Sequence, residues 1–240
     1  MGTYRELALP EGGAFRVHPD PGALPRLTHD GPGRNRYDDP EGRYAVRYAA
    51  ANLTGAMLET MARFRSAPAS EALLAAVVDG EPEPGEADHA DPAEGLADWL
   101  AVQKVGRVRL VGAGRLVDIH DPALLVRLDK HPGVRTALES SGLGTALNPA
   151  RLDEGVIRIS GPVGRDVTQA VSRALREWEP DYTGLAYRSR LDDEEWCWAI
   201  WDDTLVEVEV ENLTAEHRFH RRAVQHVARI LEVSLPVDWL

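Results

Sequence analysis

The chain has 240 residues, of which 43% are hydrophobic and 28% charged, the composition of a globular protein and not of a disordered chain. Lysine and arginine total 27 against 39 aspartates and glutamates, and the formal charge of −12 disfavours broad nucleic-acid binding. The one cysteine, Cys197, excludes an internal disulfide framework and a multi-cysteine zinc site, and is typical of a protein in a reducing compartment.

The sequence gives no sign of export or membrane insertion. No apolar run approaches the ~18 residues of a membrane-spanning helix. The N-terminal stretch MGTYRELALPEGG lacks the apolar core of a secretory signal. We therefore expect a cytoplasmic protein with no membrane contact and no direct nucleic-acid binding. Whether it forms a homo-oligomer is left open.

The first half of the chain mixes strand and helix patterns. A short strand is predicted at 14–17, and strict alternation predicts another at 43–48. An amphipathic helix follows to about residue 64, with an apolar stripe of Leu53, Met57, Met61 and Phe64. Residues 79–98 are acidic and broken by Pro and Gly, which indicates a solvated loop or insertion.

The second half continues with short elements. Strands are predicted at 105–111, 115–119, 156–160, 185–189, 196–201 and 205–211. Helices are predicted at 122–128, from Asp166 onward, and at about 215–233 with Thr214 as N-cap. Segments on both sides of 79–98 read as strands of one sheet, so we expect a single domain over residues 1–240. Because strands and helices do not alternate regularly, the fold class is α+β: a mixed central β-sheet flanked by helices.

Two motifs are set aside. Gly112-Ala-Gly114 begins like a dinucleotide fingerprint, but Val117 stands at the third glycine and a strand follows instead of a helix. His217, His220 and His226 crowd the last helix, yet no carboxylate completes a metal site there at helical spacing. No metal is therefore predicted.

Several separated segments together carry a resemblance. They are FRV at 15–17, RY at 36–37 before Gly42, YAAANLTGAMLE at 48–59, GRDVTQAVSRALRE at 164–177, GLAYRSR at 184–190 and AIWD at 199–202. In this order and spacing they resemble the RES domain family, named for a shared Arg, Glu and Ser. The resemblance spans roughly residues 15–64 and 156–203, and the acidic stretch 79–98 looks like extra length.

The resemblance implies a compact α+β fold similar to that of ADP-ribosyltransferase toxins, with NAD⁺ as substrate. It implies a cytoplasmic NAD⁺ glycohydrolase or phosphorylase, which cleaves the nicotinamide N-glycosidic bond and serves as the toxin of a toxin–antitoxin pair with an Xre-type antitoxin. One alternative is a protein ADP-ribosyltransferase using the same site. A second alternative is a non-catalytic interaction module that keeps the fold.

The resemblance also assigns roles to named residues. Glu59, Arg16 and Ser189 are the expected catalytic set, with Glu59 facing the ribose, where an oxocarbenium-like charge develops. Arg16 and Arg36 suit the pyrophosphate, Tyr37 and Tyr48 suit the flat cationic nicotinamide, and Ser189 suits its amide or ribose.

The residues alone leave a plainer alternative open. Glu59 lies off the buried stripe of its helix, and a solvated pair with Arg63 at i+4 is a common surface arrangement. The acceptor of the ADP-ribosyl group, whether water, phosphate or protein, also stays open.

Overall fold

The computed structural model describes residues 4–19, 35–65, 92–110, 112, 114–144, 149–201 and 205–240. Its centre is a seven-stranded sheet in the order β4-β5-β6-β2-β1-β3-β7. The strands are β1 (Ala14–His18), β2 (Val46–Ala50), β3 (Lys104–Leu110), β4 (Leu116–Asp118), β5 (Gly184–Arg188), β6 (Trp196–Trp201) and β7 (Leu205–Asn212). β4 and β5 are parallel, and the other pairs are antiparallel. The predicted mixed α+β architecture is confirmed.

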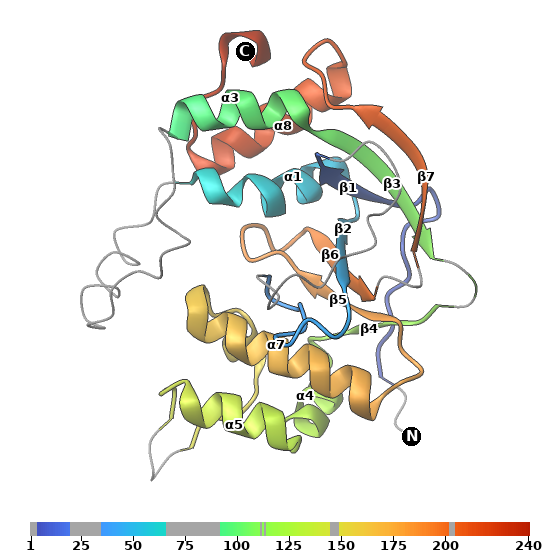
Figure 1. Cartoon of the computed structure of the whole chain (residues 1–240), viewed down its shortest axis with the longest axis vertical. Helices are drawn as coiled ribbons and strands as arrows, with labels where there is room; N and C mark the ends of the chain where they lie inside the picture. The colour runs from blue at the N-terminus through green and yellow to red at the C-terminus, as the bar shows by residue number, and fades with distance from the viewer. Residues whose placement is uncertain are drawn as a thin grey trace.

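The helices form two groups on one face of the sheet (Figure 1). One group contains α1 (Leu53–Met61), continued by a 3₁₀ turn at Ala62–Phe64, with α3 (Pro92–Val102) and α8 (Arg218–Leu231). The other contains α4 (Pro122–Leu128), α5 (Pro132–Ser140) and α7 (Gly161–Trp178), with the short α6 (Glu154–Ile157) packed on α7.

Register defines which side chains share the face beneath these helices. Phe15 pairs with Ala50, Ala50 with Cys197, and Cys197 with Tyr187, so all four point to the helix side. They belong to the main core cluster, whereas Ala14 lies in a separate small cluster on the opposite face. The helix side therefore holds most of the core, and Tyr187 lies within it.

Some predicted elements are corrected. The strand predicted at 156–160 is wrong, because its first two residues are the last two of α6. Asp153 caps this helical turn by accepting a hydrogen bond from the Val156 amide at 2.8 Å. The loop predicted at 79–98 is wrong from Pro92 onward, where α3 buries Leu96 and Leu100 in the core. The remainder of that stretch, 79–91, lies outside the described residues.

Other differences concern element ends. β2 begins three residues later than the predicted strand, α7 begins at Gly161 instead of Asp166, and α8 has His217 and not Thr214 at its N-cap. α5 was not predicted, because only Val134 and Leu138 of its nine residues are buried and its apolar stripe is short.

Candidate active site

Glu59 lies on α1, whose apolar side packs into the core. The predicted stripe of α1 holds, since Leu53, Met57 and Met61 are fully buried. The Asn52 side chain caps the helix by accepting from the Gly55 amide at 2.9 Å. In the last turn of the helix, Glu59 lies off this stripe and is half-buried.

The carboxylate of Glu59 accepts one hydrogen bond on each oxygen. Ser189 Oγ donates to Oε1 at 2.7 Å, and the Tyr187 hydroxyl donates to Oε2 at 3.2 Å. Both donors are uncharged and almost completely buried. Burial, followed by the Glu59 charge, raises the pKa of Tyr187 well above its ordinary value, so this phenol stays protonated.

The surface alternative for Glu59 is wrong. Arg63 donates through Nε to the Thr60 carbonyl at 3.2 Å, and its guanidinium lies 5.8 Å from the centre of the Trp99 ring. Glu59 instead bonds residues 128 and 130 positions away in sequence. Glu59 is therefore part of a tertiary site that joins α1 to the end of β5.

Ser189 is held in place by the turn that follows β5. Its amide donates to the Glu195 carbonyl at 2.9 Å, and its Oγ accepts from the Leu191 amide at 3.2 Å. Since Oγ also donates to Glu59, both hydrogen-bonding capacities of this hydroxyl are used, and its orientation is fixed.

Arg36 brings a positive charge with unused donors to the same place. Its Nη2 donates to the Ile157 carbonyl, and its guanidinium lies 5.1 Å from the centre of the Tyr37 ring and 5.7 Å from that of Tyr187. Within the described part of the chain, Nε and Nη1 of Arg36 are buried and have no hydrogen-bond partner. Such donors are costly to leave unsatisfied, so they favour a ligand that accepts hydrogen bonds.

A second guanidinium lies near Arg36. Partial burial, and then the positive charge of Arg36, lower the pKa of Arg190, whose Nη1 donates to the Ile159 carbonyl at 3.4 Å. Glu59 lies close enough to oppose that shift. The site therefore combines one carboxylate with two arginines. The arginines suit an anionic ligand, and the carboxylate suits a ligand atom on which positive charge develops during a reaction.

The two predicted aromatic residues, Tyr37 and Tyr48, pack against or hydrogen-bond other residues of the site. Tyr37 is fully buried, 4.9 Å from the Tyr187 ring centre. The Tyr48 hydroxyl accepts from the Tyr37 amide at 3.0 Å and donates to Asp38 Oδ1 at 2.9 Å, which fixes the segment that carries Arg36. Their contact with nicotinamide stays a prediction.

Arg16 does not join this group. It follows Phe15 on β1, and because side chains alternate along a strand, it lies on the opposite face of the sheet, with Ala14. The structure thus brings together Glu59, Ser189, Arg36 and Tyr37, and separates Arg16 from them. A catalytic or binding role of Arg16 stays a prediction.

Tyr187 is not among the site residues predicted from the sequence, although its hydroxyl bonds Glu59. The sequence signal that could have identified Tyr187 is its spacing from Ser189. Residues two apart along a strand share a face, so a strand end that directs Ser189 toward Glu59 directs Tyr187 the same way.

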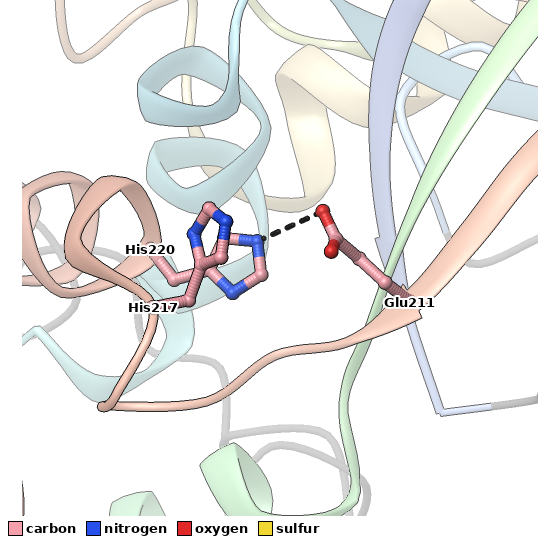
Figure 2. Close-up of side chains that lie close together, drawn as sticks. All are labelled: Glu211, His217 and His220. Atoms are coloured by element: carbon pink, nitrogen blue, oxygen red, sulfur yellow. Dashed lines mark hydrogen bonds and ion pairs between the residues drawn. The ribbon is translucent and has the colours of Figure 1, made fainter.

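A second group of titratable side chains is a histidine cluster (Figure 2). Glu211 at the end of β7 and His217 and His220 at the start of α8 have potential metal-ligand atoms within 4.8 Å of one another. The carboxylate that the helix pattern lacks thus comes from a strand. His220 Nε2 lies 3.2 Å from Glu211 Oε1, and the two histidine ring centres are 4.1 Å apart.

The hydrogen bonds of His220 disfavour a metal at this cluster. Its Nδ1 accepts from the Thr214 amide at 3.3 Å, which places the proton of the neutral ring on Nε2, where it is donated to Glu211. A metal on Nε2 requires the proton on Nδ1, facing the Thr214 N–H, whereas metal-binding histidines normally donate from the second nitrogen. We interpret the cluster as a hydrogen-bonded link between β7 and α8.

Among the residues that the structure describes, none of the helices is both long enough and apolar enough to span a membrane. The fold and the site define an α+β protein in which a helix glutamate, a serine at a strand end and a buried arginine converge. The RES domain family model matches residues 14–222, most of the chain, and the protein belongs to this family. Searches of curated proteins and of solved structures found no match.

Proposed function

We propose that this protein cleaves the N-glycosidic bond between nicotinamide and ribose in NAD⁺. The observation that carries the proposal is the Glu59 carboxylate, held by two neutral hydroxyl donors beside two arginines. Family membership supports it, because the resemblance stated above implies NAD⁺ as substrate.

The arrangement suits the charge changes of this reaction. As nicotinamide leaves, positive charge develops on the ribose, and a fixed carboxylate stabilises that charge more than it stabilises the ground state. Ser189 and Tyr187 hold the carboxylate without neutralising it, since neither donor carries a charge. The Arg36 donors that have no partner among the described residues suit the pyrophosphate oxygens.

The test is product analysis. Purified protein is incubated with NAD⁺ with and without inorganic phosphate, and the products are separated by liquid chromatography and mass spectrometry. Free nicotinamide with ADP-ribose indicates hydrolysis, nicotinamide with ADP-ribose-1″-phosphate indicates phosphorolysis, and modified protein indicates ADP-ribosyl transfer. A folded sample that releases no nicotinamide under any of these conditions would overturn the proposal.

We further propose that the activity is toxic in the cytoplasm and is restrained by an Xre-type antitoxin, as the family resemblance implies. Expression in a bacterial host is expected to deplete NAD⁺ and arrest growth, and Glu59→Gln is expected to relieve both effects. Growth arrest without NAD⁺ depletion would contradict this proposal. If an Xre-like protein is encoded beside this chain, its co-expression should restore growth.

A further inference from the structure

His120 ends the parallel ladder between β4 and β5. The paired positions stop at Asp118 and Ala186, and the Ile119 amide then donates to the Ala186 carbonyl at 3.0 Å. The next outward amide on β5, that of Arg188, donates to Nε2 of His120 at 3.1 Å. A side-chain nitrogen thus takes the place of a strand carbonyl immediately before Ser189.

The imidazole lies in a buried position, and its Nδ1 has no hydrogen-bond partner among the described residues. Its side chain is only 7% exposed, and its own amide donates to Asp118 Oδ1 at 2.9 Å. Its Nδ1 lies 3.6 Å from Glu154 Oε1 on α6. Because Nε2 accepts from an amide, the neutral ring carries its proton on Nδ1, on the side of Glu154.

We propose that His120 is a positioning residue for the Glu59 site: its neutral imidazole fixes the end of β5, and thereby Ser189, which orients the carboxylate. The proposal rests on the proposed function for its catalytic consequence. The link is short, because the Arg188 amide donates to His120 and the next residue, Ser189, donates to Glu59. Arg158 reinforces the same turn with a 3.5 Å hydrogen bond to the Ser189 carbonyl.

The constraint depends on the charge of the ring, since a protonated imidazole has no acceptor for the Arg188 amide. Among the described residues, the charges of Asp118 on β4 and Glu154 on α6 favour protonation of His120, and those of Arg158 and Arg36 oppose it. Burial, the largest effect, lowers the pKa of His120 below 6.5, so the ring is neutral at pH 7.

The experiment compares His120→Ala and His120→Gln with the wild type by two readouts. The first is hydrogen exchange of the Arg188 amide, which does not depend on catalysis. The second is kcat and KM for NAD⁺. We expect His120→Ala to speed exchange of this amide at least tenfold and to lower kcat at least tenfold with KM within threefold. His120→Gln, whose side-chain carbonyl can accept from the amide, should recover most of both.

His131→Ala is the matched control, because the His131 side chain is 8% exposed against 7% for His120, and it also accepts a hydrogen bond from a backbone amide, that of Gly133 at the start of α5. It should destabilise the fold while leaving kcat and Arg188 exchange unchanged. Unchanged Arg188 exchange in His120→Ala would overturn the positioning role, and so would faster exchange with unchanged kcat. A wild type that does not consume NAD⁺ would overturn the proposed function instead, since the exchange readout would still report on His120.

Discussion

Replacing Glu59 by Gln separates a catalytic carboxylate from a structural one. The carboxylate has two partners, Ser189 Oγ at 2.7 Å and the Tyr187 hydroxyl at 3.2 Å. Both are hydroxyls, which accept as well as donate, so the carboxamide of Gln can keep a hydrogen bond to each after a rotation of one hydroxyl. The loss of folding stability should therefore stay within about 1 kcal/mol.

The same substitution removes the negative charge that the developing oxocarbenium requires. If this electrostatic contribution is about 2.7 kcal/mol or more, the turnover number falls at least about a hundredfold. Because the charge acts mainly in the transition state, the Kd for NAD⁺ should change far less. The contrast between a large loss of turnover and a small loss of stability is the signature of this role.

The assay measures nicotinamide release at saturating NAD⁺, together with the melting temperature and NAD⁺ binding by calorimetry. Glu139→Gln is the control, since Glu139 is exposed on α5 and pairs only loosely with Arg135 at 3.7 Å. A Glu59→Gln protein that releases nicotinamide within threefold of the wild-type rate would refute the assignment. So would a variant that loses turnover in proportion to the fraction unfolded.

Three further predictions follow from other contacts. Arg36→Lys should raise the Kd for NAD⁺ at least tenfold, because an ammonium cannot present the planar fork of donors; an unchanged Kd in calorimetry would contradict the pyrophosphate role. Asp39→Asn should cost about 2 kcal/mol at neutral pH. Burial raises the pKa of Asp39, but hydrogen bonds from Arg43 outweigh it and hold the pKa below its ordinary value, so the difference should vanish in denaturant titrations as the pH falls through that lowered pKa. Zinc in tenfold excess should leave the melting temperature unchanged; a rise that His217→Ala abolishes would show that the histidine cluster binds metal.

The sequence predicts elements whose pattern is local. β5, β6 and β7 show clear strand patterns, and Asp121 followed by Pro122 marks α4, where the Asp121 side chain accepts from the amides of Ala123 and Leu124. Residues 156–160 also alternate, but the Asp153 cap and packing against α7 outweigh that signal. Patterns of five residues cannot by themselves decide between a strand and a capped helical turn.

The site required information that periodicity does not contain. Glu59 and Ser189 are 130 residues apart, and each alone reads as an ordinary surface residue of a helix or a strand. Only the family resemblance connected them, and it could not show that Tyr187 completes the carboxylate. The same resemblance included Arg16, whose strand register depends on pairing with β2 and β3 and is not readable from FRV alone.

The charge of the whole chain and the charge of the site have opposite signs. A formal charge of −12 repels an anionic dinucleotide at long range, but this repulsion is screened beyond about 8–10 Å at physiological salt. Inside that distance the ligand meets Arg36 and Arg190. Burial, and then repulsion by Arg36, lower the pKa of Arg190, and the repulsion is relieved when an anion lies near both guanidinium groups. Low salt should therefore slow NAD⁺ association without preventing binding, because the distant repulsion grows while the local attraction remains. For a site that attracted its ligand at long range, low salt would instead speed association.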